Sequence, residues 1–580
     1  MMADLGRTVL ARQRMARLWA LGDRSSPESR TPGLVVTDED FDVEYAPFRV
    51  SSDGKIPRGI VIDSRAPFAP WHSKENGPTL SASIGHVLPP SLDEADAGEV
   101  ASKGEVISIS WQSLNHDQEL LDPQLKPHVV ILSDALQLAN RPGKLVKAIH
   151  VIKHRFPGSL LWTPGIGGPD NCAVLAWFGV DLFDTTRVMQ AKSHNAVITW
   201  NGPRLAYENE SANSHWESAI ADVRSAISDN RLRELAQSQS LNSPRLVEHL
   251  RNHDKIISES EGVLSQVVNK GTALRIHSVE SHNEPIILDW VDFISNRYQM
   301  PDGLDDVLIL LPCSARKPYS ASRSHKAFRR AINHSSAHEV IITSPLGLVP
   351  RDLEEVWPAG HYDIPVTGDW TLDETQRVTE MLDSLVERNS YRVIINHSGF
   401  DYSSSVPVID TRNGNSATNS TALETLSDVV SNHIQVKRRS GEQINIANFR
   451  SVARFHHLND DWLDGVQVRG RFPRWKILKD GEQIAMWAPE RGGFSISKAC
   501  VPLIDSTDSL KRIHLKPDVK WKGDVNLVNL ETYDKSIRSG EDLLVMQGEQ
   551  CVGLARASAP AWEWSSTPGR LAKMHQRLKN

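Results

Sequence analysis

A short segment, residues 311–325, concentrates reactive side chains of several kinds. It reads LPCSARKPYSASRSH and supplies a thiol (Cys313), an amine (Lys317), a phenol (Tyr319), hydroxyls that include Ser322, and an imidazole (His325). A thiolate is a strong nucleophile, and neighbouring amines, phenols and imidazoles can move the protons that its reactions require. The segment therefore predicts a reaction centre with Cys313 as the nucleophile, Lys317 beside it, and Tyr319 or His325 as proton carrier.

The flanking residues predict how this segment is held. Residues 307–311 (VLILL) have the pattern of a buried parallel strand, and a helical pattern begins after Ser322, its expected N-cap. Ligands of open α/β sheets bind where a strand's carboxyl end meets a helix amino end. We expect that helix end, together with Arg316 and Lys317, to favour the Cys313 thiolate. The alternative is a small buried cysteine in a structural turn.

Two further apolar runs end in polar side chains. Residues 339–344 end in Thr343 and Ser344, and residues 391–397 end in Asn396 and His397. Parallel strands bring their carboxyl ends to one edge, so these groups should lie near Cys313. Between them lies a loop with paired acids, suited to a charged amine. We therefore expect four substrate-binding residues here: Ser344, His361, Asp363 and His397. The alternatives are an ordinary polar turn at 361–363 and a core histidine at 397.

The pattern Pro-Cys, three residues, Lys-Pro-Tyr, two residues, Ser, two residues, His resembles the signature of the archaeosine synthases, paralogues of the archaeal tRNA-guanine transglycosylases. The resemblance covers nearly the whole chain and is strongest over residues 305–370. It implies a transferase that acts on the nitrile of 7-cyano-7-deazaguanine at position 15 of the tRNA D-loop. An amine donor, for which lysine is expected, would convert the nitrile to an amidine-type product. Cys313 would add to the nitrile carbon, and the amine would then displace the thiol.

The first third of the chain has an alternating β/α rhythm, with apolar runs at 58–63, 106–111, 128–134, 160–163 and 180–184. This rhythm predicts a barrel. Residues 157–171 and 179–184 resemble the transglycosylase barrel, in which Asp184 would attack the ribose. The CxCxxC zinc site of that family and its second acid are absent from the sequence, so Asp184 is expected to help hold the modified base, or to cap a strand end. Two alternative functions stay open: a tRNA-guanine(15) transglycosylase that uses Asp184, and a non-catalytic tRNA-binding subunit.

The remaining segments complete the domain plan. We expect packing helices over 211–265, a Ser/Thr/Asn-rich linker over 403–427, and a β-rich unit over 449–497. The last 70 residues resemble a PUA RNA-binding domain. Its expected RNA contacts are Arg538, Arg556, Arg570, Lys573 and Arg577.

The predicted fold class is multidomain α/β. A degenerate transglycosylase-like (β/α) barrel with a helical extension occupies 1–285, and an α/β sheet domain with the catalytic segment occupies 286–430. A small α+β domain (431–507) and a C-terminal β-rich PUA domain (508–580) follow.

Composition narrows the partners and cofactors. The net charge is −7, so an RNA surface must be a local basic patch. Four cysteines without a CxxC pair predict no disulfide framework, metal site or iron–sulfur cluster, and no cofactor is expected. The first 24 residues contain no long apolar run, so we expect a cytoplasmic protein without a membrane partner. The expected partners are tRNA bearing 7-cyano-7-deazaguanine and an amine such as lysine. A radical SAM enzyme and a second copy of the chain are left open as further partners.

Overall fold

The computed structural model describes residues 6–22, 25–36, 41–42, 44–50, 60–64, 71–72, 80–84, 106–260, 266–268, 271–304, 306–334, 336–365, 369–434 and 438–578. The chain divides into two compact units. The first contains residues 1–265, 526–528 and 559–571, and the second contains 266–525, 529–558 and 572–580. No helix among the described residues is long and apolar enough to cross a membrane.

The first unit is built on a largely parallel sheet. Its strand order is β7 (Trp71–His72), β5 (Phe48–Val50), β4 (Gly33–Val36), β12 (Leu182–Asp184), β11 (Leu160–Trp162), β10 (Val129–Leu132) and β9 (Val106–Ile109), and only β7 runs antiparallel to its neighbour. A parallel pair, β6 (Ile60–Ser64) and β8 (Leu80–Ile84), adds two strands. β8 lies beside β9, and β6 lies beside β5 and β7. The strand segments predicted from the apolar runs are therefore confirmed within a few residues.

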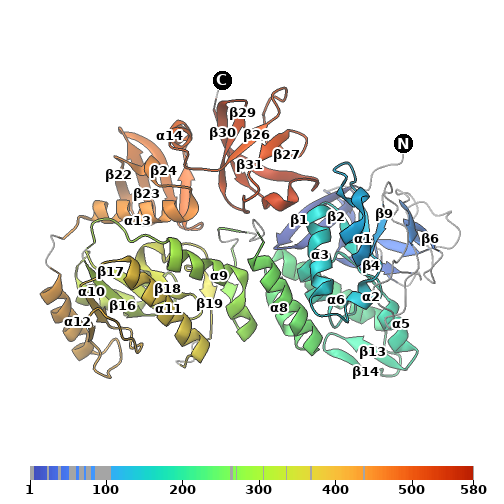
Figure 1. The fold of residues 1–580 in the computed structure, drawn as a ribbon, viewed down its shortest axis with the longest axis horizontal. Coiled ribbons are helices and arrows are strands. Elements are labelled where there is room, and N and C mark those ends of the chain that lie inside the picture. The colour runs from blue at the N-terminus through green and yellow to red at the C-terminus, as the bar shows by residue number, and fades with distance from the viewer. Residues whose placement is uncertain are drawn as a thin grey trace. The chain divides into compact units, whose positions relative to one another are not determined.

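Helices and small antiparallel elements surround that sheet. The helices are α1 (Trp111–His116), α2 (Ala135–Leu138), α3 (Lys144–Arg155), α4 (Cys172–Phe178), α5 (Thr186–Lys192), α6 (Ala212–Ser228), α7 (Leu232–Ser240) and α8 (Pro244–Ser258). A meander of β1 (Arg7–Gln13), β2 (Ala16–Gly22) and β3 (Pro27–Thr31) and a hairpin of β13 (Ala196–Thr199) and β14 (Gly202–Leu205) complete the unit. The helices expected over 211–265 are confirmed as α6, α7 and α8 (Figure 1).

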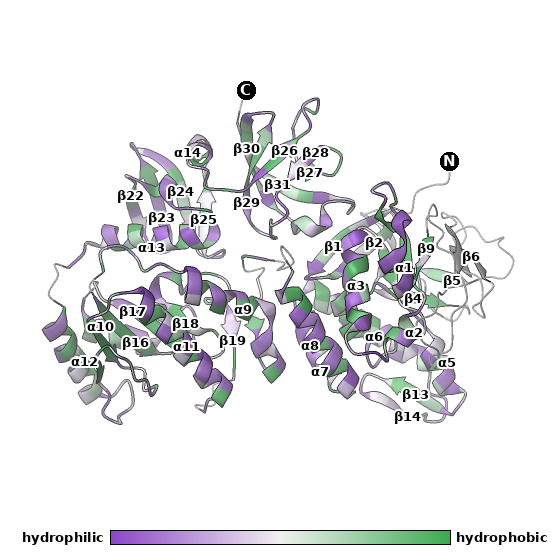
Figure 2. Ribbon diagram, viewed as in Figure 1, coloured by the Kyte–Doolittle hydropathy of each residue, from purple (hydrophilic) through white to green (hydrophobic). Residues whose placement is uncertain are grey.

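The second unit contains a five-stranded sheet. Its order is β18 (Gly347–Pro350), β17 (His338–Thr343), β16 (Val307–Pro312), β20 (Val393–Asn396) and β21 (Val408–Asp410), and only β18 is antiparallel. Residues 307–311 of β16 are fully buried, and Figure 2 shows this strand in the hydrophobic colour. Each such aliphatic side chain contributes roughly 1.5–3 kcal/mol on burial, so β16 is an anchored central strand. The helices around this sheet are α9 (Pro285–Asp292), α10 (Arg323–Ile332), α11 (Leu372–Arg388) and α12 (Ser420–His433).

The predicted linker over 403–427 is wrong. Residues 408–410 form β21, which pairs with β20 in parallel, and α12 begins at Ser420 behind an Asn419 N-cap. Buried apolar side chains of α12, Ala422, Leu426 and Val430, pack the helix onto the domain. The Ser/Thr/Asn composition reflects a cap and a solvent-facing side rather than a flexible connection.

Two β-rich regions follow. A four-stranded antiparallel sheet consists of β22 (Gln467–Arg471), β23 (Arg474–Lys479), β24 (Glu482–Ala488) and β25 (Gly493–Ile496), flanked by α13 (Gly441–His456) and α14 (Val501–Ser506). The β-rich unit expected over 449–497 thus begins as a helix. A six-stranded sheet then runs β27 (Val525–Asn526), β31 (Arg570–Arg577), β30 (Gln550–Ala557), β29 (Asp542–Gln547), β26 (Arg512–Leu515) and β28 (Leu530–Tyr533). The mixed α/β layout with a β-rich C-terminal region is confirmed.

Candidate active site

Three parallel strands of the second unit end at the same edge of the sheet. β17, β16 and β20 are neighbours, so Thr343, Cys313 and Asn396 come at or directly after the ends of adjacent strands. The register pairs Leu310 with Asn396, and the His397 amide donates to the Leu310 carbonyl over 2.9 Å. The expectation that these strand ends deliver their polar groups to one edge is confirmed.

The loop after β16 is fixed by hydrogen bonds at both ends of its last turn. The Ser320 amide donates to Glu354 Oε2 over 3.0 Å. Ser322 is the N-cap of α10, because its hydroxyl accepts from the His325 amide over 3.2 Å. This cap, which the sequence predicted, satisfies one of the free amides at the start of the helix. The loop that follows Cys313 is therefore held in a defined conformation.

Cys313 is half-buried, and its environment differs from the prediction. Burial raises the pKa of its thiol, and the Thr343 side chain and the charge of Lys317 offset this only in part. This direction is opposite to the preference for the thiolate that the sequence predicted. The sequence shows the neighbouring cations but not how far the loop removes the sulfur from water, and that loss of hydration disfavours the charged form.

Three hydroxyl groups form a buried chain beside the thiol. Tyr319 and Tyr362 share a hydrogen bond of 2.5 Å, and Tyr362 shares another of 2.6 Å with the Thr343 hydroxyl. Burial raises the pKa of both phenols, so both are protonated near neutral pH. A chain of hydroxyls can relay a proton without carrying a charge itself.

Lys317 lies over this chain. Its Nζ is 4.0 Å from the centroid of the Tyr362 ring, a cation–π contact. Burial lowers the pKa of Lys317, and the charges of Cys313 and Asp363 oppose the change. The thiol and the amine thus each shift toward the neutral form, so the structure favours the neutral pair over a thiolate–ammonium pair more than water does, and the neutral amine is able to accept a proton.

His325 is buried, and both ring nitrogens are occupied. Nε2 donates to the Pro312 carbonyl over 3.0 Å, and Nδ1 accepts from Arg351 Nη2 over 2.9 Å. Burial and the Arg351 charge lower the pKa of His325 to about 3, so the ring is neutral. A ring with both nitrogens engaged positions the loop, and this geometry favours Tyr319 over His325 as the proton carrier.

Arg351 is a residue that the sequence did not single out. Its guanidinium donates to Glu339 and to Glu354 Oε2, each over 2.9 Å, as well as to His325. It therefore joins β17, the loop after β16 and the start of α10. The only signal in the sequence was the acid-rich surroundings of residues 351–354, which identify a charged turn but not its partners.

The predicted substrate-binding residues lie in different environments. Ser344 donates to Glu374 Oε1, and Asp363 is exposed within reach of the Lys317 charge. His361 is half-buried, and burial lowers the pKa of its ring. His397 is buried, with Nδ1 2.7 Å from the Thr411 hydroxyl and Nε2 donating to the Ala417 carbonyl over 2.8 Å. In this conformation Asp363 is open to a ligand, and His397 holds the loop that follows β21.

Asp184, in the first unit, accepts three hydrogen bonds. Its Oδ2 accepts from Trp162 Nε1 over 3.2 Å and from the Gly165 amide over 2.8 Å, and Oδ1 accepts from the Thr186 amide over 2.9 Å. The carboxylate therefore ties β11, the loop after it and α5 together. Such an arrangement is typical of a strand-end cap, the structural alternative that the sequence left open.

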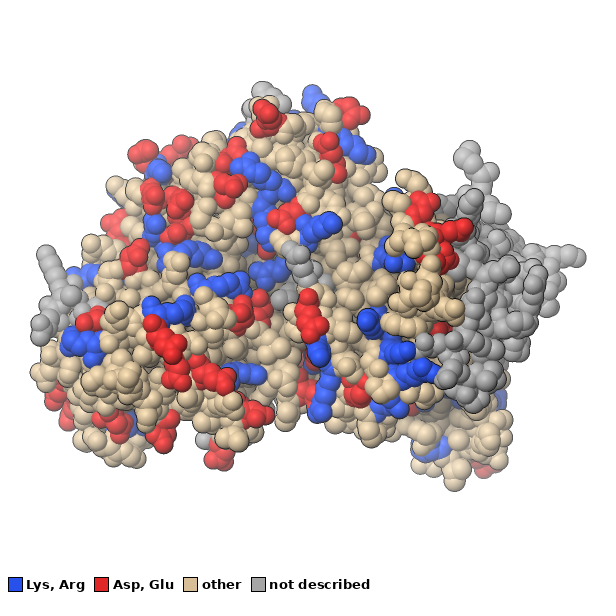
Figure 3. Space-filling view, viewed as in Figure 1, with Lys and Arg blue, Asp and Glu red and all other residues tan. Residues whose placement is uncertain are grey.

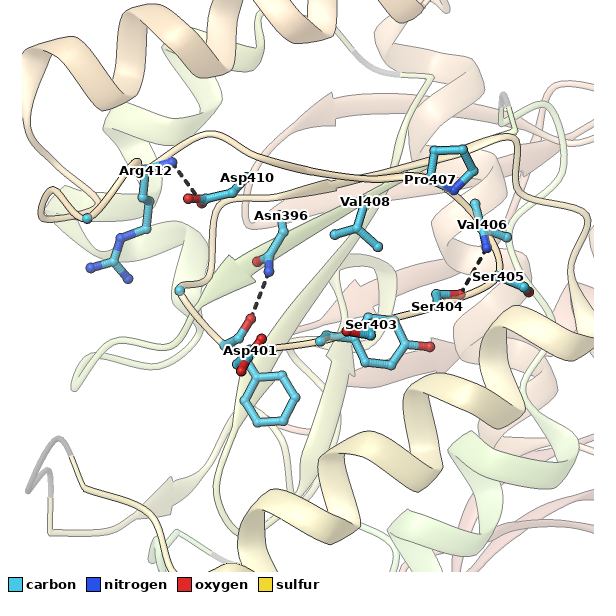
Figure 4. Close-up of a pocket in the computed structure, with 14 residues that line it drawn as sticks. Asn396, Asp401, Ser403, Ser404, Ser405, Val406, Pro407, Val408, Asp410 and Arg412 are labelled. Atoms are coloured by element: carbon cyan, nitrogen blue, oxygen red, sulfur yellow. Dashed lines mark hydrogen bonds between the residues drawn. The ribbon is translucent and has the colours of Figure 1, made fainter.

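An open groove with a volume of 720 Å³ lies at the carboxyl end of β20 (Figure 4). It is lined by the segment from Gly399 to Val408 and by Asn396, Asp410, Arg412 and Gly414. Asn396 ends β20, next to the strand that leads to Cys313. Asp410 accepts from the Arg412 and Asn413 amides, whereas the exposed Asp401 carboxylate has no partner among the residues that the structure describes.

The five basic residues expected to contact RNA differ in their surroundings. Arg538 pairs with Asp289 at 3.2 Å and Arg556 with Asp542 at 2.8 Å. Arg570, Lys573 and Arg577 lie on β31 and are exposed. On the face shown in Figure 3, acidic and basic side chains are interspersed, so neither sign of charge dominates that face.

Within the described ranges, no group of three His, Cys, Asp or Glu side chains could hold a metal ion.

Comparisons with known proteins bear on both units. The family described as "Domain of unknown function (DUF5591)" matches residues 287–432, the domain with the candidate site. Archaeosine synthase subunit alpha of Thermoplasma acidophilum is 28% identical over 456 residues, covering 77% of this chain and 86% of the relative. Its counterpart from Methanosarcina acetivorans is 28% identical and covers 92% of this chain and 93% of the relative.

Two further matches cover less of the chain. Archaeosine synthase of Haloferax volcanii is 30% identical over 357 residues, covering 56% of this chain and 60% of the relative. A crystal structure of a protein of unknown function, 19% identical, covers 50% of this chain and all of its own, with a TM-score of 0.41.

Proposed function

The chain belongs to the archaeosine synthase family, and we propose that the Cys313 loop is the centre at which this tRNA-modifying transferase performs its chemistry. The observation that supports this most is the grouping of a thiol, an amine and a chain of three hydroxyls at one sheet edge. The substrate we propose is tRNA whose 7-cyano-7-deazaguanine presents its nitrile to Cys313. The product is an amidine formed with an amine, for which lysine is the proposed donor.

The first half of the reaction adds the thiol to the nitrile. Lys317 takes the proton of the Cys313 thiol, and the sulfur bonds to the nitrile carbon. One C–N π bond breaks, and the nitrile nitrogen takes a proton from the Lys317 ammonium or from the hydroxyl chain of Tyr319, Tyr362 and Thr343. The result is a thioimidate attached to Cys313.

The second half releases the enzyme. The amine donor attacks the thioimidate carbon, the C–S bond breaks, and the Cys313 thiolate takes back a proton from the new nitrogen through Lys317. The sum of both halves is nitrile plus amine giving amidine, so atoms and charges balance without an oxidant or a reductant. Asp363 and Asp401 are the carboxylates we propose for the ammonium groups of the donor, because both are exposed near this edge.

The first unit fits a recognition role in this proposal. The neighbouring positions of β9, β8, β6 and β5 follow the order of a closed barrel, and we propose a degenerate transglycosylase-like barrel over 1–285. The hydrogen bonds that Asp184 accepts favour a structural over a nucleophilic role. We further propose the catalytic domain at 286–430, the small domain at 431–507 and an RNA-binding PUA domain at 508–580. Because three relatives are named as alpha subunits, we also propose a second polypeptide partner, such as a radical SAM enzyme.

The test is mass spectrometry of nitrile-bearing tRNA incubated with the protein and single amines. We expect a mass gain equal to the whole amine, largest with lysine, and no gain with Cys313→Ala. In wild-type samples quenched early, a protein–nucleoside adduct at Cys313 is expected. Product formation by Cys313→Ala at the wild-type rate would contradict the covalent mechanism, and release of labelled guanine would favour the transglycosylase alternative.

A further inference from the structure

The hairpin of β22 and β23 carries basic side chains in an unusual arrangement. Residues 469–476 read RGRFPRWK, and the register places Arg469 opposite Lys476 and Arg471 opposite Arg474. Opposed residues of an antiparallel pair point to the same face, and so do residues two apart along a strand. The four cations therefore share one face of the hairpin, which Figure 1 shows as adjacent strands.

These cations have no acidic partner within the hairpin's described surroundings. The one side-chain hydrogen bond of the group joins Arg469 to Gln467 Oε1 over 3.1 Å. All four side chains are exposed. Like charges directly opposite each other destabilise a sheet. A hairpin selected for stability alone would alternate charge signs, so this arrangement indicates an anionic partner.

The tip of the hairpin adds an aromatic ring. Phe472 is 61% exposed and is followed by Pro473. Hairpin turns usually carry Gly, Asn or Asp, which suit both the backbone and water. The opposite face is anchored, because Val468 and Ile477 are buried as a cross-strand pair. A rigid hairpin thus presents a ring at the end of a row of cations.

We propose that the β22–β23 hairpin is an RNA-binding element that grips an unpaired segment of the tRNA. Arg469, Arg471, Arg474 and Lys476 would contact phosphates, and Phe472 would stack on an unstacked base. The inference rests on the proposed function, which supplies the tRNA. A lipid surface fits less well, because the hairpin exposes one ring and lacks the broad apolar face that membrane association uses.

The experiment measures binding of the full-length protein to a fluorescent tRNA transcript over a series of salt concentrations. Arg471→Gln/Arg474→Gln is expected to weaken binding and to reduce the slope of log K against log salt by about two. The matched control, Lys255→Gln/Lys498→Gln, removes two exposed cations elsewhere and should change neither quantity.

Phe472 is tested separately because stacking does not release counterions. Phe472→Ala should weaken binding roughly tenfold with an unchanged salt slope. Phe472→Trp should restore binding, whereas Phe472→Leu, which keeps an apolar side chain but lacks a ring, should not. The thermal unfolding midpoint of each variant is expected to match or slightly exceed that of the wild type, since the replaced side chains are exposed and the cations repel one another.

The outcomes separate the two proposals. If the wild type binds tRNA and the hairpin variants bind it equally tightly with the same salt slope, the hairpin inference alone is overturned. Absence of wild-type binding would overturn the proposed function and the inference with it. If the variants lose binding to anionic phospholipid vesicles while their tRNA binding is unchanged, the hairpin binds a membrane surface. This result would also overturn the inference that the hairpin binds RNA.

Discussion

Replacement of Lys317 by Met isolates the role of the amine beside the thiol. Methionine keeps an unbranched apolar chain against the Tyr362 ring but removes the charge and the base. In the wild type the Lys317 charge lowers the pKa of Cys313 against the larger effect of burial. Without that charge the pKa of the Cys313 thiol should rise, so the thiolate fraction at a given pH should fall.

Turnover should fall further than the thiolate fraction. Loss of a positioned acid–base group costs about 10²–10⁴ in rate, so Lys317→Met should lower turnover by at least that factor. Lys317→Arg separates the two effects. Arginine keeps the charge and should restore the thiol pKa, but it cannot give up its proton and should not restore turnover.

Two assays follow the two quantities. The pH dependence of Cys313 alkylation, read by peptide mass spectrometry, reports the thiol without tRNA. Its wild-type midpoint is expected above the ordinary value of about 8.5. Single-turnover formation of the amidine reports the chemistry. An alkylation midpoint below pH 7, or wild-type turnover by Lys317→Met, would refute the proposed proton transfer.

Three further changes test other parts of the molecule. Asp184→Asn disturbs a carboxylate that accepts three hydrogen bonds, so we expect a loss of about 1–3 kcal/mol in unfolding free energy with the tRNA modification rate retained; an unchanged thermal midpoint with no product would restore a catalytic role. Asp401→Asn should raise KM for the amine about tenfold with little change in kcat, measured by steady-state kinetics, and an unaltered KM would remove the groove from the proposal. Burial raises the pKa of Asp352 to about 6. Its folded-state pKa therefore exceeds the unfolded value, and the associated stability is present at low pH and is lost as pH rises toward 6. Asp352→Asn should raise the free energy of unfolding at pH 8 by at most about 3 kcal/mol and should leave it unchanged near pH 3.5. Thermal unfolding at the two pH values measures this difference, and equal effects at both would contradict a raised pKa of Asp352.

The sequence by itself determined the central elements and the reactive side chains that they carry. Residues 307–311 are continuously apolar and rich in branched side chains, as expected of a strand buried on both faces, and Ser322 before a helical pattern predicted the start of α10. These local signals placed Cys313, Lys317 and Tyr319 together, and the spacing of the motif resembled that of one family, to which the relatives found by comparison also belong. Such features depend on neighbouring residues along the chain, so sequence alone suffices to find them.

Only the tertiary structure decided the protonation of the site's side chains and which distant residues contact them. Whether Cys313 is thiol or thiolate depends on how much water the folded loop excludes, which no local pattern records. Tyr362 lies in β19 (Tyr362–Asp363) and Arg351 directly follows β18, 49 and 38 residues away from Cys313 in sequence, and both reach the site only because these strands are packed where they are. The supposed linker at 403–427 is ordered because buried side chains of α12 find a surface on the domain. Each of these outcomes depends on contacts between distant segments, and those contacts exist only in the folded chain.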